Sequence, residues 1–369
     1  MLNKKTIAVV VPAYNEETQI GIVLDTMPDF VDRIIVVNDC SKDKTAEIVK
    51  DYIEREQKLE QQNKEKKASI PPIKPPEETV FNKADIVLFE MRIEEESKYP
   101  PHEIYNDNNT DRIVLINILK NSRVGGAIKT GYKWCREHGI DCTAVMAGDA
   151  QMDPAELESI CLPVIEEDID YVKGNRLWHG ASRRVIPKKR HFGNSVLSAM
   201  TKVSSGYWRI SDTQTGYTAI SLRALNKLKI YDIYNNYGMP NDLLIKLNVA
   251  QCSLREIPIK PVYNVGEQSK MKIGKVIPTV SWLLIRGFFK RILQKYFIND
   301  FHPIFVFYFI SSLSLFSSIY FLVFVFIGLA NKAVTSGTYF GFVLSFILFI
   351  LLFSFGMWFD MIDNERLQK

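Results

Sequence analysis

Oxygen-bearing side chains stand directly after apolar runs in this chain, and two of these places suit a nucleoside. The run Ile7–Val11 leads into the sequence PAYNEE, and Arg33–Val37 leads into an Asn-Asp pair that ends at Asp39. Asp and Glu at two adjacent strand ends suit hydrogen bonds to the base and ribose of a nucleoside. Asp39 is the sharpest candidate for such a contact.

Simpler roles compete at the neighbouring polar positions. Asn15 could cap the helix that follows the first run, and Ser41 and Asp43 suit a turn and a helix cap. The pair Gly125-Gly126 enters another predicted helix, where backbone amides attract anions such as phosphate. Close helix packing is the commoner reason for a glycine pair.

A third strand-like run leads straight into Asp149 and Gln151, two oxygen-bearing side chains spaced by two. Ligands of this kind can hold Mg²⁺ or Mn²⁺ against a diphosphate. Asp153 has another explanation, because it precedes Pro154 with Glu156 three residues later, which is the pattern of a helix N-cap. We therefore expect Asp149 to bind the metal, Gln151 to be the second ligand, and Asp153 to be mainly a cap.

The elements that position these residues alternate between strand and helix. This alternation predicts an α/β fold with a mostly parallel sheet and helices on both faces, whose ligands lie beyond the carboxyl ends of the strands. The expected strands are 7–11, 33–37, 113–118, 142–146 and 171–174, and the expected helices are 16–27, 44 onward, 126–138 and 154–165.

Residues from about 54 to 110 interrupt the alternation. The segment is highly charged at first, holds four prolines within Ile70–Pro76, and becomes polar toward its end. Such composition predicts a partly disordered insertion, with one strand at Ile86–Met91. We expect this insertion to be dispensable for the chemistry.

Two long apolar runs near the C-terminus predict transmembrane helices. Ile304–Ala330 and Ala333–Phe359 contain no charged side chain, and about 20 apolar residues cross a bilayer. The chain therefore divides into a catalytic domain (1–265), a basic juxtamembrane segment (266–300) and two transmembrane helices (301–360).

The juxtamembrane segment carries cations and aromatic residues at helical spacing, among them Trp282 and Phe289. This pattern predicts a helix lying in the membrane interface, with packing against the catalytic domain as the alternative. Seven cations between Lys270 and Lys295, with no acidic residue among them, form the positive-inside signature and place the catalytic domain in the cytoplasm. The seven cations are Lys270, Lys272, Lys275, Arg286, Lys290, Arg291 and Lys295.

The five cysteines form no CxxC pair and no metal-ligand spacing. We expect them to be reduced and mostly buried, as in a cytosolic domain. No nucleic-acid partner is expected, and a homo-oligomer is left open.

The ordered motifs PAYNEE, VNDCSKDKT, RVGGA, GDAQMDP, GNR and DTQTGYTAI resemble those of glycosyltransferase family 2. The likeness is strongest to polyprenyl-phosphate sugar transferases of the dolichol-phosphate mannose synthase type, and it covers about residues 5–270 outside the insertion. It implies the GT-A nucleotide-diphospho-sugar transferase fold and a divalent metal. It also implies an inverting transfer from a UDP- or GDP-linked sugar to a polyprenyl phosphate, either undecaprenyl or dolichyl.

The resemblance assigns roles to individual residues of the donor site. Pro12, Tyr14, Glu16 and Asp39 would contact the nucleoside, and Asp149 with Gln151 the metal and diphosphate. The family often has a further Asp where this chain has Ala147, so metal binding would rest on fewer carboxylates.

The acceptor site is also implied by the resemblance. Its lipid phosphate would contact Arg176, Arg190, Asn194 and Lys270, because guanidinium groups suit phosphate. Asp212 would orient these cations or the sugar. For Asp242, contact with the sugar and a simple helix start are equally open.

Two other functions fit parts of this pattern. A processive polysaccharide synthase of the same superfamily would bring a Gln-x-x-Arg-Trp motif and further membrane helices, which this sequence does not show. A non-catalytic relative would keep the fold, and Ala147 is the only argument for it.

Overall fold

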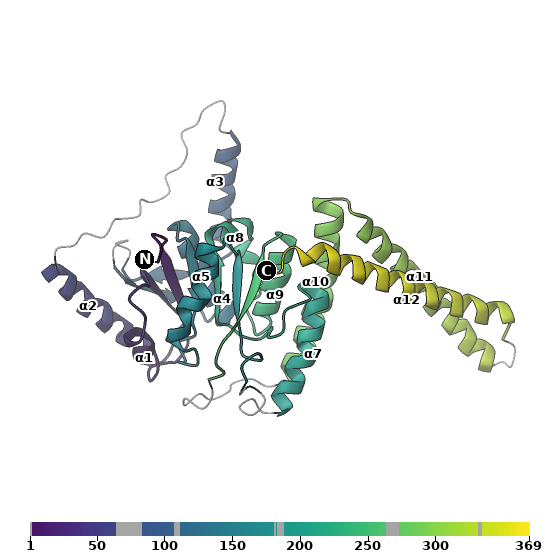
Figure 1. The fold of residues 1–369 in the computed structure, drawn as a ribbon, viewed down its shortest axis with the longest axis horizontal. Coiled ribbons are helices and arrows are strands. Elements are labelled where there is room, and N and C mark those ends of the chain that lie inside the picture. Colours follow the sequence, from purple (N-terminus) through teal and green to yellow (C-terminus); the bar gives the residue numbers. More distant parts are fainter. Residues whose placement is uncertain are drawn as a thin grey trace.

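The computed structural model describes residues 2–63, 83–106, 111–180, 182, 188–262, 273–330 and 334–369. An α/β domain with a central sheet forms the N-terminal part, and a helical hairpin extends from one side of it (Figure 1). The predicted α/β fold class is confirmed.

The sheet has eight strands in the order β3-β4-β2-β1-β5-β7-β6-β8. Only β3 and β7 run antiparallel to their neighbours, so the predicted mostly parallel sheet is confirmed. The strands are β1 (Ile7–Ala13), β2 (Arg33–Asn38), β3 (His102–Ile104), β4 (Ile113–Ile118), β5 (Cys142–Val145), β6 (Tyr171–Asn175), β7 (Thr218–Ser221) and β8 (Leu254–Pro258).

Helices cover both faces of the sheet because each central strand is apolar on both sides. Along β1, Val9 and Val11 pack into a core with α1, α2 and α5, whereas Val10 packs into a second core with α4, α8 and α9. The helices are α1 (Ile20–Asp25), α2 (Thr45–Asn63), α3 (Lys83–Glu96), α4 (Arg123–Glu137), α5 (Leu157–Glu166), α7 (Lys188–Ser205), α8 (Leu222–Lys227) and α9 (Met239–Val249), with 3₁₀ turns η1 (Pro154–Glu156) and η2 (Ile230–Asp232).

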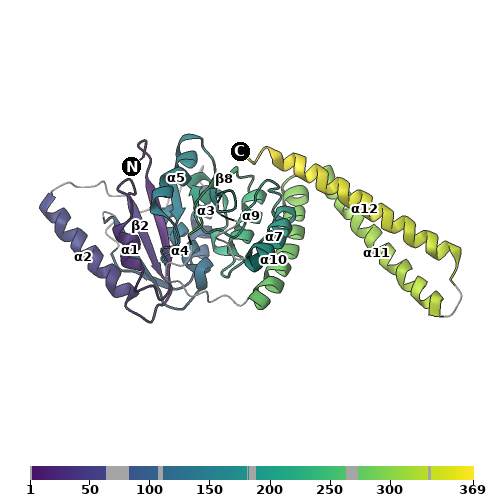
Figure 2. The ribbon, with the colours of Figure 1, turned by 60° about the horizontal axis from the view of Figure 1, so that its bottom comes forward.

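The C-terminal part is helical throughout its described length. It consists of α10 (Ile273–Leu293), a π-helical turn η3 (Gln294–Asn299), α11 (Pro303–Ala330) and α12 (Ser336–Glu365). Figures 1 and 2 show α11 and α12 side by side as they lead away from the sheet. Both are long and apolar enough to cross a bilayer. In the most apolar 18-residue stretch of each helix, only 22% (α11) and 11% (α12) is buried. That exposure argues against a pair of buried core helices.

Helix α10 corrects part of the interface prediction. Val280 and Leu284 are buried in one cluster with residues of α7 and α9, so this face follows the alternative of packing against the domain. Trp282 and Phe289 are 67% and 60% exposed on another face. Helical spacing predicts an apolar surface, but it does not show which surface a neighbouring helix covers.

The described part of the insertion also differs from the expectation. The predicted strand at Ile86–Met91 is wrong, because these residues belong to helix α3, and a short apolar run alone does not distinguish the two. Strand β3 pairs with β4, and Tyr99 lies in the core. The prolines of 70–76 lie outside the described residues. Parts of the insertion therefore belong to the edge of the catalytic domain.

Asn106→Ala tests this structural role. The buried Asn106 amide donates to Asp111 and to the Ile113 carbonyl at 3.0 and 2.6 Å, and it accepts from the Leu115 amide at 3.1 Å. Because the alanine leaves these groups buried without their partner, we expect the free energy of unfolding to fall by about 2–3 kcal/mol in urea titrations.

The matched control is Ser97→Ala, which removes an exposed bond from the Ser97 hydroxyl to the Glu94 carbonyl. It should change the free energy of unfolding by less than about 0.5 kcal/mol. Equal effects of the two substitutions would contradict the role of Asn106 at the sheet edge.

Candidate active site

The ends of β1, β2 and β5 meet at one edge of the sheet. The Asp39 amide donates to the Ala13 carbonyl at 2.9 Å, and the Gly148 amide donates to the Pro12 carbonyl at 3.2 Å. Parallel pairing in register therefore brings Pro12, Asp39 and the neighbouring Asp149 to the same edge, as the sequence predicted.

The loops after β1 and β2 are joined by hydrogen bonds. Asn15, with a φ of 56°, donates its amide to Ser41 Oγ at 3.0 Å, and its side chain accepts from the Lys42 amide at 2.9 Å. The suggested cap by Asn15 is therefore wrong, since its side chain holds the other loop. The predicted cap by Asp43 is confirmed, because Asp43 accepts from the Thr45 amide at the start of α2 at 3.1 Å.

The four proposed nucleoside contacts differ in exposure. Tyr14 and Glu16 are partly exposed, whereas Asp39 is only 3% exposed. Asp39 Oδ1 accepts from the Ser122 amide at 2.6 Å and from its hydroxyl at 2.9 Å. Burial raises the pKa of Asp39, and these bonds oppose the rise. Asp39 therefore also fixes the start of α4, a role that the sequence did not reveal.

Close packing explains the glycine pair at the start of α4. A Cβ on Gly125 would lie 2.1 Å from the Tyr234 carbonyl oxygen, and one on Gly126 would lie 2.3 Å from Ser122 Oγ. The Gly125 amide donates to the Asn235 carbonyl at 2.9 Å. The packing alternative is confirmed, because neither position has room for a side chain.

The loop after β5 presents the proposed metal ligands. Asp149 is half-buried, and its Oδ1 accepts from the Gln151 amide at 3.1 Å, while Ala150 between them has a φ of 57°. Asp153 accepts from the Ala155 amide at 3.0 Å before η1, so the predicted cap is confirmed.

The donor set at this loop fits a cation that is held largely by its substrate. Among the described residues, no three His, Cys, Asp or Glu side chains gather as a metal cluster. Mg²⁺ in phosphate-transferring sites is commonly bound through one or two carboxylates plus substrate phosphates, and Asp149 supplies one such carboxylate.

An ion pair at the end of β6 forms the other half of the site. Arg176 binds Asp212 through two bonds, from Nε at 2.8 Å and from Nη2 at 3.0 Å, and Asp212 is 2% exposed. Burial favours the neutral form of Asp212, but the bonds from Arg176 and the charge of Lys173 outweigh it and hold the pKa of Asp212 below its usual value.

Two charged residues beside this ion pair, the buried Lys173 and the partly buried Glu256, were not predicted. Lys173 is fully buried and donates to the Thr215 carbonyl, and burial lowers its pKa to about 8 against the pull of Asp212 and Glu256. Glu256 accepts from the amides of Ser211 and Asp212 at 2.9 and 3.0 Å. A lysine within an otherwise apolar strand was the available signal in the sequence.

The remaining acceptor residues are only partly placed. Arg190 and Asn194 lie in the first two turns of α7, and Lys270 lies outside the described residues. Asp242 lies in the first turn of α9, where it accepts from the Tyr234 amide at 2.9 Å and pairs with Lys246. These contacts favour the alternative in which Asp242 begins a helix over the one in which it contacts the sugar.

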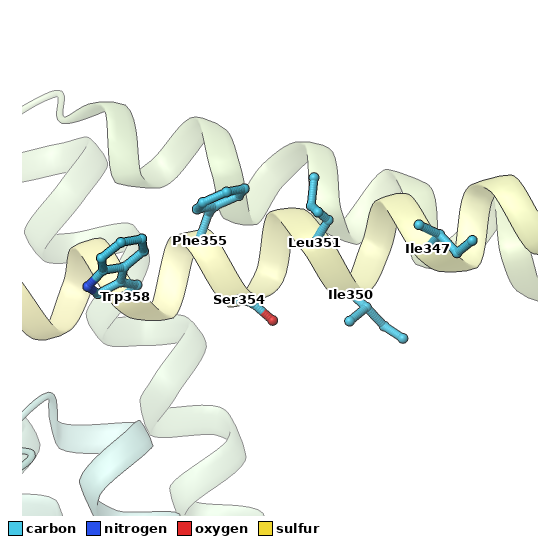
Figure 3. A pocket seen from close by; sticks show the side chains of 6 residues that line it. All are labelled: Ile347, Ile350, Leu351, Ser354, Phe355 and Trp358. Carbon is cyan, nitrogen blue, oxygen red and sulfur yellow. The ribbon is translucent and has the colours of Figure 1, made fainter.

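A hollow of about 350 Å³ lies elsewhere, on α12. Figure 3 shows its lining side chains along one stretch of that helix. They are apolar apart from Ser354 and the indole nitrogen of Trp358, so the hollow offers nothing to a nucleoside or a phosphate. Its lining residues are Ile347, Ile350, Leu351, Ser354, Phe355 and Trp358.

The mixed sheet with oxygen-bearing loops at its carboxyl edge agrees with the GT-A fold that the resemblance implies. A family model described as glycosyl transferase family 2 matches residues 8–68. This match agrees with the resemblance to glycosyltransferase family 2 seen in the motifs.

Two relatives match most of the chain. A UDP-N-acetylglucosamine–dolichyl-phosphate N-acetylglucosaminyltransferase of Methanococcus voltae is 28% identical over 260 residues, covering 70% of this chain and 86% of the relative. An uncharacterised protein of Methanocaldococcus jannaschii is 26% identical over 298 residues, covering 80% and 95%. Among solved structures, glucosyl-3-phosphoglycerate synthase of Mycobacterium tuberculosis matches with a TM-score of 0.45 and 15% identity, covering 78% and 81%.

Asp212→Asn tests the ion pair of the site. The amide cannot balance the charges of Arg176 and Lys173, so the guanidinium loses its fixed position. We expect kcat/KM for sugar transfer to fall by about tenfold to a hundredfold in the folded protein.

Asp170→Asn is the matched control. Asp170 is also buried and paired with an arginine, Arg223 at 2.7 Å, but it precedes β6 and therefore lies at the opposite edge of the sheet. This substitution should lower stability and leave kcat/KM per folded molecule unchanged. A similar loss of activity in both variants would show that Asp212 serves the fold alone.

Proposed function

We propose that the protein transfers a sugar from a nucleoside-diphosphate sugar to a polyprenyl phosphate at the cytoplasmic face of a membrane. One observation carries this proposal. The same sheet edge holds Asp149 and the Arg176–Asp212 pair, and the same chain bears two helices long and apolar enough to cross a bilayer. The Methanococcus voltae relative is named for a UDP-sugar donor and a dolichyl-phosphate acceptor, which supports the same substrate classes.

The donor would lie across the ends of β1, β2 and β5. Pro12, Tyr14, Glu16 and Asp39 would contact its nucleoside, as the resemblance implies. Asp149, with Gln151 beside it, would hold Mg²⁺ or Mn²⁺, which neutralises the charge of the departing nucleoside diphosphate.

The acceptor phosphate would bind on the side of β6. Asp212 fixes the plane of the Arg176 guanidinium, whose forked donors suit a phosphate. Arg190, Asn194 and Lys270 would complete this phosphate site. An already oriented guanidinium loses little side-chain entropy when the lipid phosphate arrives.

The transfer itself would be a direct displacement at the anomeric carbon of the sugar. An oxygen of the lipid phosphate forms the new bond, the bond to the nucleoside diphosphate breaks, and the anomeric configuration inverts. The phosphate is already an anion at neutral pH, so the step needs no strong general base. The protein contributes by placing the two reactants and by shielding their charges.

The hairpin would enter and leave the membrane on the side of the catalytic domain. Three residues separate η3 from α11. The residues after α12 return to β8, where the Leu254 amide donates to the Leu367 carbonyl at 2.7 Å. The cations of the juxtamembrane segment then favour a cytoplasmic catalytic domain.

Asp149→Ala tests the donor half of the proposal. Without this carboxylate the cation loses a protein ligand, so we expect sugar transfer to fall at least about a hundredfold at limiting Mn²⁺ and to recover only in part at high Mn²⁺. The measurement is radiolabelled sugar transfer from a UDP-sugar to polyprenyl phosphate in detergent.

Asp153→Ala serves as the control, because Asp153 belongs to the same loop but caps η1 and is not a proposed ligand. It should leave the dependence on Mn²⁺ concentration unchanged. Turnover like that of the native protein in Asp149→Ala at limiting Mn²⁺ would overturn the assignment of Asp149.

A further inference from the structure

We propose that a buried polar cluster fixes the orientation of the catalytic domain relative to the membrane hairpin, and that transfer to membrane-embedded lipid phosphate depends on it. This inference rests on the proposed function for its acceptor, although the orientation itself can be measured separately. The anchor cluster consists of Arg291, Lys295, Tyr296, Asp360, Asp363 and Asn364.

The centre of the anchor cluster is a fully buried ion pair between α10 and α12. Arg291 donates to both carboxylate oxygens of Asp360, at 2.7 and 2.9 Å, and both residues are 0% exposed. The same guanidinium donates to the carbonyls of Ser204 and Val203 in α7 at 2.8 and 3.1 Å. Gly206 has a φ of 77°, and a Cβ there would lie 2.8 Å from Arg291 Nη1. One side chain therefore joins three helices in a space shaped around it.

A second layer surrounds this ion pair. The hydroxyl of Tyr296 lies 2.7 Å from Asp360 and 2.9 Å from Asp363. Lys295, only 3% exposed, pairs with Asp363 at 2.9 Å. The turn η3 thus contributes a cation and a phenol to two carboxylates of α12, which balances the buried charges.

The end of α12 also joins the catalytic sheet. Asn248 of α9 donates to Asn364 at 2.7 Å. Beyond the helix, the Leu254 amide donates to the Leu367 carbonyl at 2.7 Å, and the Lys369 amide donates to the Leu254 carbonyl at 3.0 Å. The C-terminal residues therefore extend the open edge of β8.

Strand β8 connects this junction with the site. Two residues after Leu254, Glu256 accepts from the amides of Ser211 and Asp212 and so holds the loop that carries the partner of Arg176. The position of α12 therefore sets where the strand next to the proposed phosphate site lies relative to the membrane hairpin.

The chemistry of the anchor cluster is better suited to fixing the orientation of the hairpin than to adding stability. A buried ion pair adds little stability over apolar residues of equal volume, because both charges lose their hydration. A forked guanidinium–carboxylate contact, in contrast, is satisfied in one geometry only.

The double variant Arg291→Met with Asp360→Leu tests the proposal in the full-length protein. It replaces the ion pair by apolar side chains of similar size, so the junction stays packed but loses its fixed geometry. Arg291→Lys keeps the charge and loses the fork. Arg209→Met is the matched control, since it breaks an exposed ion pair, to Glu365, between the same two parts of the chain.

Two acceptors distinguish a loss of domain orientation from a general loss of catalytic activity. With polyprenyl phosphate in liposomes, we expect the double variant to lose about tenfold to a hundredfold in kcat/KM, chiefly through the KM for the lipid. With a soluble short-chain prenyl phosphate, kcat/KM and the KM for the nucleotide-sugar should stay within about twofold of the native values, because such an acceptor reaches the site in any orientation. Arg291→Lys should lie in between, and Arg209→Met should match the native protein. Native use of the liposomal acceptor by the double variant, or an equal loss with both acceptors, would overturn the proposal.

A distance measurement tests the orientation without any activity. Spin labels on Glu158→Cys in α5 and Tyr339→Cys in α12, both at exposed positions, report the distance between domain and hairpin once Cys40 is replaced by Ser. We expect one narrow distance distribution in the otherwise native protein and in Arg209→Met, and a broad one in the double variant. An unchanged narrow distribution in the double variant would overturn the proposal. If the native protein transfers sugar to neither acceptor, the proposed function fails, and the distance distributions alone decide the role of the anchor cluster.

Discussion

The parallel arrangement of the central strands is the constraint on which the site depends. Because β1, β2, β5 and β6 run in one direction, the loops that follow them leave the sheet at one edge. The antiparallel β7 starts at that same edge, so the loop before it brings Asp212 to Arg176. Residues from distant parts of the sequence therefore meet without any long excursion of the chain.

Electrostatics divides this edge into two halves. On one side Asp39 and Asp149 offer carboxylates, which suit a nucleoside and a metal-bound diphosphate. On the other side the charges of Arg176 and Lys173 are balanced by Asp212 and Glu256. Such balance lets cations stay buried near a phosphate site without the full cost of desolvation. The two reactants of the proposed transfer are both anions. The donor diphosphate would meet the carboxylates through a metal ion, and the lipid phosphate would meet the Arg176 guanidinium.

The sequence predicted most of the sheet because its strands are short β-branched runs buried on both faces. It failed where the partner of a residue is remote. Asn15 is a residue type that is common at helix caps, yet its side chain binds the loop after β2. The apolar run in α3 is too short to distinguish strand from helix. Arg291 carries the charge expected of a membrane-surface residue, but it is fully buried against Asp360. Spacing in the chain reveals an apolar or a charged surface, whereas only the tertiary structure shows what covers it.

The most direct test of the account is the chemical identity of the product. The full-length protein would be reconstituted in liposomes with polyprenyl phosphate, a UDP-sugar and Mn²⁺, and the lipid would be analysed by mass spectrometry and by ³¹P NMR. The account predicts one new lipid that carries a single sugar on a single phosphate as a phosphodiester, with one UDP released per molecule formed and the anomeric configuration inverted. A lipid with a diphosphate link, or UDP release without any glycosylated lipid, would contradict it.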